Sequence, residues 1–214
     1  GLYIRGHSLG GMSGRSISGI LTDFFSWHVA LLGIGLISLL AGFIFWRLLP
    51  PSAHFQPQKL EMKLGNSLFT HFKEPALIYL FIIGFLVMGG FVSLYNYIGF
   101  QLLEPPYSLS HTIVGFIFIV YMVGTFSSTW MGMLADQHGK KGILQLSLVI
   151  LLCGAMITLS TNLWIKIAGI AIFTYGFFAA HSIASSWVGN TAVHNKAQAS
   201  ALYLFFYYAG SSIG

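Results

Sequence analysis

The chain has few charged residues. Lys and Arg together number 10 and Asp and Glu number 5 in 214 residues, so that 7% of the chain is charged, whereas a soluble domain carries roughly 25%. Hydrophobic residues make up 56%. A water-soluble globule of this size needs a charged surface, and a disordered chain needs low hydrophobicity with high charge. The composition therefore excludes both classes and predicts a polytopic membrane protein.

Cysteine and clustered metal ligands are also scarce. The single cysteine, Cys153, lies inside an apolar run and has no partner for a disulfide. The sequence has no HExxH motif, no second histidine one helical turn from His181, and no pair of acids inside an apolar run. A membrane-embedded enzyme needs such ligands, or a nucleophile with its base. We therefore expect no catalytic residue, no metal site and no cofactor.

Long apolar runs dominate the chain instead. A membrane-spanning helix needs about 20 mostly apolar residues, and these runs lack the period-two alternation of β-barrel strands. Six such runs and the start of a seventh follow one another: 1–21, which is the weakest, 29–49, 76–103, 111–134, 142–160, 164–189 and the partial run 200–214. The polar segment 51–74 is expected to form a long loop. The predicted fold class is all-α, a polytopic bundle of transmembrane helices.

Lysine and arginine gather on one side of this arrangement. Seven of them lie at every second connection: Arg47, Lys59, Lys63, Lys73, Lys140, Lys141 and Lys196. The alternate connections hold only Lys166. Since positive loops stay in the cytoplasm, residues 51–74, 135–141 and 190–199 are predicted to be cytoplasmic, and 22–28, 104–110 and 161–166 external. The net charge of +5 is explained by these loops, and no nucleic-acid partner is expected.

The two ends of the chain resemble each other. Residues 1–14 read GLYIRGHSLGGMSG and residues 201–214 read ALYLFFYYAGSSIG. Leu2, Tyr3, Gly10 and Gly14 recur at an offset of 200 as Leu202, Tyr203, Gly210 and Gly214. Chance similarity between two Gly-rich apolar segments is one explanation. The other is a parallel repeat of six helices about an axis along the membrane normal.

A ten-residue motif in a short cytoplasmic turn indicates the family. Residues 132–141 read GMLADQHGKK, which resembles the loop signature G-x-L-A-D-x-x-G-[KR]-[KR] of the major facilitator superfamily. All specified positions match. They are Gly132, Leu134, Ala135, Asp136, Gly139, Lys140 and Lys141. The resemblance implies a transporter fold of 12 helices in two six-helix halves, of which this chain is an internal fragment, since it begins at Gly1 and ends inside a run at Gly214.

The resemblance also implies a register. The family has a long cytoplasmic loop between its sixth and seventh helices, to which residues 51–74 correspond. The runs are then helices five to ten, with the eleventh begun. The domain division implied is 1–49 for the last two helices of the first half, 50–74 for the loop between the halves, and 75–214 for the second half.

The signature residues are candidates for a gate. A carboxylate at Asp136, at the cytoplasmic end of a helix, can accept hydrogen bonds from an arginine or from the N–H groups of another helix. Lys140 and Lys141 can pair across to the other half or with anionic lipid headgroups. Gly139 permits a tight reversal. The alternative is an ordinary positively charged turn without a gating role.

The first run is rich in glycine. Gly6, Gly10 and Gly14 are spaced four apart, and small residues at this spacing let helices approach closely in lipid. The segment resembles the fifth-helix signature G-x-x-x-G-P-x-x-G-G of drug/proton antiporters at three of five positions, with Gly11 and Arg15 in place of the proline and the last glycine. The amino-acid sequences of both chain ends resemble those of drug-efflux-like bacterial inner-membrane transporters of the YnfM type.

Four polar residues inside the runs are candidates for a substrate cavity. Arg15 is a charge deep in the first run, where it should face a cavity or a partner; an ion pair or an outward-reaching side chain is the alternative. His181 lies among small residues of the sixth run, and either lines a cavity or bonds a neighbouring helix. Tyr95 and Asn96 lie toward the outer end of the third run. Because tyrosines are common at the membrane–water interface, an interfacial anchor is the alternative to a cavity role for Tyr95.

The expected function is secondary active transport. The resemblance implies alternating-access movement of a small organic solute or drug across the bacterial inner membrane, with proton-coupled efflux as the expected mode. A sensor, receptor or channel of the same fold is the alternative. Because no acid lies at mid-membrane, a proton carrier is expected in other helices of the full protein, or else at His181. The expected partners are the substrate, protons and membrane lipids, and the expected full-length protein is a monomer.

Overall fold

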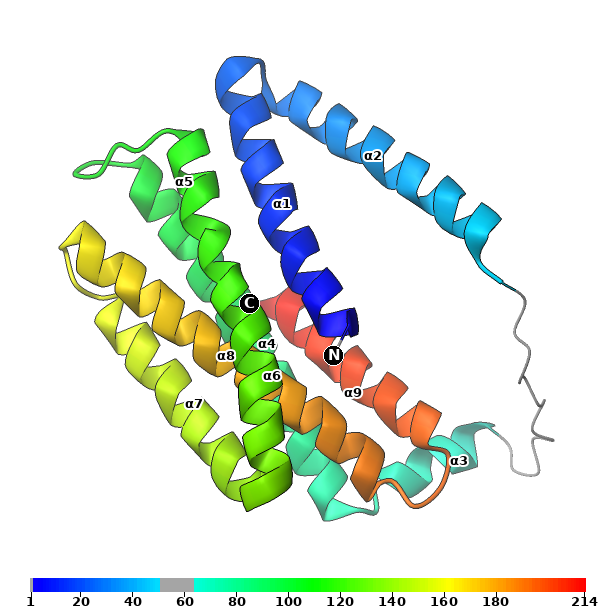
Figure 1. The fold of residues 1–214 in the computed structure, drawn as a ribbon. Coiled ribbons are helices and arrows are strands. Elements are labelled where there is room, and N and C mark those ends of the chain that lie inside the picture. Colours follow the sequence, from blue (N-terminus) through cyan, green and yellow to red (C-terminus); the bar gives the residue numbers. More distant parts are fainter. Residues whose placement is uncertain (1, 51–63) are drawn as a thin grey trace.

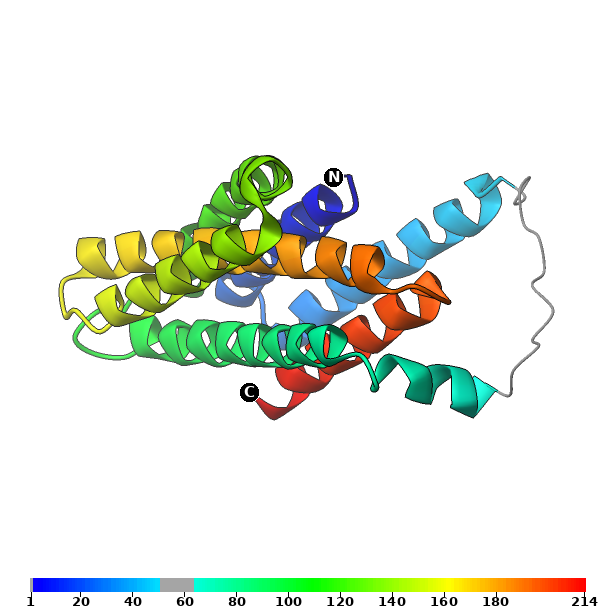
Figure 2. The ribbon, with the colours of Figure 1, turned by 90° about the horizontal axis from the view of Figure 1, so that it is seen from below.

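The structure, a computed structural model, describes residues 2–50 and 64–214, and for residues 2–9, 11, 12, 15, 64–67 and 118 it describes the backbone alone. The described residues form helices and no strand (Figures 1 and 2). In chain order these helices are α1 (Leu2–Phe24), α2 (Trp27–Leu48), α3 (Leu64–His71), α4 (Pro75–Leu103), α5 (His111–Ile117), the short 3₁₀ helix η1 (Phe118–Val120), α6 (Tyr121–His138), α7 (Lys140–Ile157), α8 (Leu163–Thr191) and α9 (Lys196–Ile213).

The predicted all-α fold is confirmed, since every apolar run is helical. Five helices in the described part of the chain are long and apolar enough to cross a membrane: α2, α4, the stretch His111–His138, α7 and α8. The sequence predicts six complete spans, and α1 is the one that does not meet this criterion. Its Gly, Ser and Arg residues lower its hydropathy, although they do not prevent a helix.

Two local predictions need correction. The segment 51–74 is not a loop throughout, because α3 forms at Leu64–His71; residues 51–63 lie outside the described residues. The external connection predicted at 161–166 ends early, because α8 already begins at Leu163. The Asn162 side chain accepts from the backbone N–H groups of Trp164 at 2.9 Å and Ile165 at 3.3 Å, which is an N-cap.

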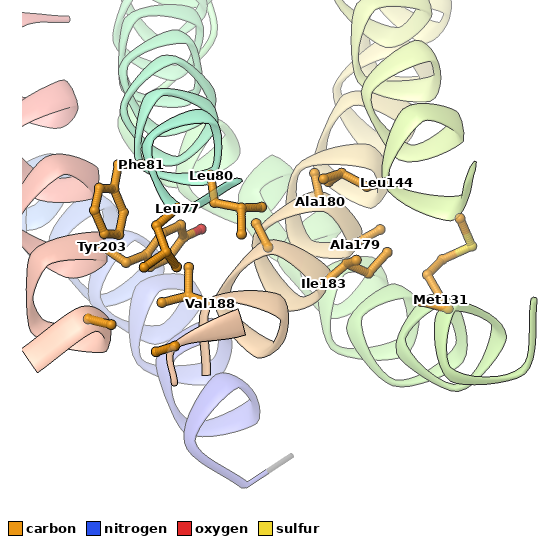
Figure 3. Close-up of a cluster of buried hydrophobic side chains, with 14 residues drawn as sticks. Leu77, Leu80, Phe81, Met131, Leu144, Ala179, Ala180, Ile183, Val188 and Tyr203 are labelled. Carbon is orange, nitrogen blue, oxygen red and sulfur yellow. The ribbon is translucent and has the colours of Figure 1, made fainter. Parts of the chain in front are cut away.

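The helices pack around α8. It contacts α7, α6 and α4, and α9 packs along α4. Close approach to α7 depends on two glycines: a Cβ at Gly154 would clash with the backbone of Phe173, and a Cβ at Gly176 would clash with the backbone of Leu151. One core cluster joins residues of α4, α6, α7, α8 and α9, with Leu80, Ala180 and Tyr203 among its members (Figure 3).

The first two helices lie beside this bundle. α1 packs on α5 and α6, and α2 packs on α1. Figure 1 shows α2 as the outermost helix, and Ala30 is its single buried residue. α1 and α9, which hold the two similar chain ends, run in the same direction in both views (Figures 1 and 2), as a parallel repeat requires. The domain division at 1–49, 50–74 and 75–214 stays a prediction.

Candidate functional site

The loop signature forms the reversal between α6 and α7. Gly139 has φ = 93°, a conformation that side chains other than glycine rarely adopt, which explains glycine at this position. Asp136 is exposed near the end of α6, and Lys140 opens α7. The Lys140 Nζ donates to the Ser186 Oγ of α8 at 2.9 Å. The signature thereby joins three helices at one end of the bundle.

A cavity of about 300 Å³ opens beside the signature. It lies between α6 and α8, whose contact includes a hydrogen bond from Ser182 Oγ to the Ser128 carbonyl at 3.2 Å. Its lining combines four signature residues with hydroxyl groups: Ser128, Thr129, Gly132, Met133, Ala135, Asp136, Lys140, Ser182, Ile183 and Ser186. Gly139 and Lys141 line a neighbouring, more open hollow of about 490 Å³ with His138, Trp187 and Asn190.

The charges and hydroxyls around this cavity define what it can bind. The Asp136 carboxylate is an acceptor at the cavity wall, and the Lys140 ammonium is a donor held by Ser186. Such a wall can take donors and acceptors from another helix that enters the cavity. The loop signature is therefore placed where a contact with another segment can form.

Two of the four predicted cavity residues lie in one buried aromatic cluster. Tyr95 of α4 is 1% exposed and its hydroxyl is 2.5 Å from Thr174 Oγ1 of α8. His181 of α8 is 6% exposed and its Nδ1 is 3.1 Å from the Tyr203 hydroxyl of α9. The rings of Phe91 and Phe177 stack between them with centroids 3.8 Å apart.

The other two predicted cavity residues lie elsewhere. Asn96 is exposed on α4, so its side chain is directed away from the buried face that holds Tyr95. Arg15 belongs to α1, and its side chain lies outside the described residues, as does that of Gly6. The four candidates therefore do not form one cavity within the described part of the chain.

The glycines spaced four apart in α1 do not make its closest contact with another helix. An added Cβ at Gly10 or Gly14 would meet nothing within 4 Å. At Gly19, by contrast, a Cβ would lie 2.5 Å from the His111 carbonyl oxygen. Ser16 Oγ donates to the Gly115 carbonyl at 3.2 Å. The spacing of Ser16, Gly19 and Asp23, which places them on one helix face, could have indicated this contact from the sequence.

Asp23 completes that contact. Its carboxylate accepts from the backbone N–H of His111 at 3.1 Å and of Thr112 at 2.6 Å. Hydrogen bonds from Thr112, and more weakly from Ser110 and His111, hold the pKa of the Asp23 carboxyl below the ordinary value of 3.8. Hydrogen bonds to the charged form of a carboxyl stabilise that form. Asp23 is therefore a charged acceptor that bridges α1 and the start of α5.

Two further buried groups escaped the sequence analysis. Lys166, predicted in an external loop, is 2% exposed within α8, and its Nζ donates to the Thr158 carbonyl at 2.6 Å and to Gln101 Oε1 at 3.0 Å. His71 ends α3 and is 5% exposed beside a cavity of about 230 Å³. Burial, followed by the nearby charge of His194, lowers the pKa of His71. Burial of these side chains depends on contacts between distant segments, which no local pattern reveals.

No group of three or more His, Cys, Asp or Glu residues that could hold a metal ion occurs among the described residues.

Comparison with known proteins places the whole chain in one family. The family model described as Major Facilitator Superfamily matches residues 1–214. Over its full length the chain is 53% identical to 53% of the MFS-type transporter YybF of Bacillus subtilis (strain 168) and 47% identical to 51% of the inner membrane transport protein YnfM of Escherichia coli (strain K12). It is also 44% identical to 52% of a transporter of Buchnera aphidicola subsp. Schizaphis graminum (strain Sg). The chain spans about half the length of these curated relatives.

Proposed function

The chain belongs to the major facilitator superfamily, and from this premise we propose that the protein is a secondary active transporter that moves a small organic solute or drug by alternating access. The full loop signature at residues 132–141 carries the proposal. Its residues line a cavity between α6 and α8, which is where a gate between two halves of a transporter would need donors and acceptors. The names of two relatives, an MFS-type transporter and an inner membrane transport protein, support this class of function.

The loop signature is proposed as the cytoplasmic gate. Asp136 and Lys140 present opposite charges at one cavity, and the bond from Lys140 to Ser186 holds the ammonium in place. A contact made in one conformation and broken in the other biases the equilibrium between them. The gate thereby controls turnover more than substrate affinity.

Proton-coupled efflux across the inner membrane is the proposed mode. YnfM is named an inner membrane transport protein, which supports the location. The five acids of the chain are Asp23, Glu61, Glu74, Glu104 and Asp136, and each lies in or beside a predicted connection. The bond between His181 and Tyr203 favours a packing role for His181. We therefore assign proton carriage to helices of the full-length protein beyond this chain, and we propose a monomer.

Flux in proteoliposomes tests the proposal. The full-length protein would be reconstituted with an imposed pH gradient, with ethidium and a mixture of radiolabelled amino acids, sugars and carboxylates as probes. We expect gradient-driven movement of at least one probe, and for Asp136→Asn a turnover lowered by about tenfold or more with a substrate KM changed by less than about threefold. A protein that binds a probe but moves none would favour the sensor interpretation. A pure loss of affinity in Asp136→Asn would contradict the gate.

A further inference from the structure

One face of α1 forms a continuous contact with the start of the next long helix. Ser16, Gly19 and Asp23 follow one another along this face and meet residues 111–115. Figure 1 shows α1 beside α5 at this end of the molecule. These residues are separated by 88 or more positions in the chain: 88 for Asp23 and His111 and 99 for Ser16 and Gly115. The contact therefore joins two distant parts of the fold.

Each of the three residues contributes in a different way. Gly19 allows the two backbones to approach, because a Cβ there would lie 2.5 Å from the His111 carbonyl oxygen. Ser16 donates to the Gly115 carbonyl. Asp23 accepts two backbone N–H groups with both of its carboxylate oxygens. Hydrogen bonds to an ionised acceptor are roughly twice as strong as neutral ones, so Asp23 makes the strongest contribution.

The contact lies on the predicted external side of the molecule, between the two predicted halves. Asp23 lies in the predicted external segment 22–28, and His111 follows the predicted external segment 104–110. α1 belongs to the predicted first half and α5 to the second. The contact at residues 111–115 precedes the start of α6, and the loop signature lies at the other end of that helix. The contact at Asp23 therefore joins the halves on the external side.

We propose that Asp23 is an external gating residue, whose two backbone hydrogen bonds hold α1 against residues 111–115 in this conformation and must break when the transporter opens outward. This rests on the proposed function. Asp23 and Asp136 then act at opposite ends of the molecule, and removal of either carboxylate shifts the conformational equilibrium in opposite directions.

A distance measurement between spin labels tests the proposal directly. In the full-length protein with Cys153→Ser, cysteines at Phe25 and Thr161 place labels on two exposed external connections outside the contact. We expect Asp23→Ala, and more weakly Asp23→Asn, to raise the ratio of long-distance to short-distance populations by about fivefold, the order expected for the loss of a helix cap. Glu104→Gln is the matched control, because it removes an exposed external acid and leaves the contact intact.

A second variant separates charge from spacing. Gly19→Ala forces α1 and His111 apart without changing any charge, and we expect the same direction of shift. Size-exclusion chromatography checks that each variant is folded, and the isosteric Asp23→Asn remains available where Asp23→Ala does not fold. Unchanged distance distributions in both Asp23→Asn and Gly19→Ala would overturn the proposal.

Measuring probe flux together with the spin-label distances tests the external gate separately from the proposed transport function. A wild-type protein that transports, with no distance shift in the Asp23 variants, contradicts the external gate and leaves the transporter assignment standing. A distance shift in a protein that moves none of the probes supports a hinge at Asp23 and contradicts the transporter assignment.

Discussion

Asp23 and Asp136 are the same residue type, but their carboxylates lie in different environments. Both carboxylates are exposed. Asp23 is held by backbone N–H groups of another segment, whereas Asp136 lies at a cavity wall beside Lys140. The first carboxylate already has its partners in this conformation. The second is placed to gain partners when segments move. Under the proposed function, the two residues would therefore act in opposite phases of the transport cycle.

The pH dependence of the external contact follows from the Asp23 carboxyl. Its pKa is lowered from 3.8, so the charged form stabilises the contact above that value, and this stabilisation is lost only as the pH falls through the lowered pKa. We expect the spin-label distances for the Phe25 and Thr161 positions to stay unchanged from about pH 8 to about pH 5. His111 is the other titratable side chain at this contact, and His111→Gln is the control. A pH-dependent shift that persists in His111→Gln would contradict the assignment.

The His181 side chain is expected to be dispensable for proton coupling. It is buried between α8 and α9 and bonds the Tyr203 hydroxyl. A glutamine can keep a bond to that hydroxyl, so His181→Gln should cost about 1 kcal/mol of unfolding free energy. We predict that pH-driven flux in the full-length variant stays within about twofold of wild type. Loss of proton coupling with substrate binding intact would make His181 the proton site.

At the scale of helices, α8 organises the bundle through contacts that differ along its length. Near its start, Lys166 joins it to Gln101 of α4 and to the Thr158 carbonyl at the end of α7. In its middle, Phe173 and Gly176 pack on α7 without intervening side chains. Toward its end, Ser186 holds Lys140. The helix is buried over much of its length for this reason.

The α7–α8 contact yields a stability prediction with a control on the same helix. A Cβ at Gly154 would clash with the backbone of Phe173, whereas a Cβ at Gly142 would meet nothing within 4 Å. Overpacking costs typically about 1–3 kcal/mol, so Gly154→Ala should lower the thermal midpoint of the detergent-solubilised full-length protein. Gly142→Ala should leave the midpoint unchanged or raise it, since alanine favours a helix. Equal effects at both positions would contradict the packing argument.

At the scale of the whole molecule, the arrangement of charges implies an orientation. The cationic residues of the described connections lie at the end of the bundle that holds Lys140 and Lys196, while Lys166 at the other end is buried and bonded. The burial of Lys166 leaves the predicted external side with even less exposed positive charge than the sequence alone indicates. This favours the predicted orientation under the positive-inside rule.

Single-cysteine labelling tests that orientation. On a Cys153→Ser background, Thr161→Cys and His194→Cys place thiols at exposed positions in opposite connections. We expect a membrane-impermeant maleimide to label Thr161→Cys only from the outside and His194→Cys only from the cytoplasmic side. The reverse pattern would invert the topology and exchange the sides assigned to Asp23 and Asp136.

Much of the fold could be predicted because it depends on local properties of the chain. Apolar runs of about 20 residues form helices wherever they occur in lipid, because the backbone must satisfy its own hydrogen bonds there. The loop signature could be found because all specified positions of residues 132–141 match the family pattern, and the positive φ of Gly139 explains one of these positions. The helix α3 was not predicted, because it has only 8 residues and lies in a segment, 51–74, that is polar as a whole. Its Leu64 and Leu68, spaced one helical turn apart, were the only local signal.

The sequence by itself determined the helical class, the order of the runs, the family and the position of the signature at residues 132–141. Only the tertiary structure decided that Gly19 rather than Gly10 or Gly14 makes the close approach, that Lys166 is buried, and that Asp23 bonds His111 and Thr112. The physical reason is the range of the interactions. Helix formation and turn conformation depend on neighbours along the chain, whereas burial and bonding partners depend on which faces of distant helices meet.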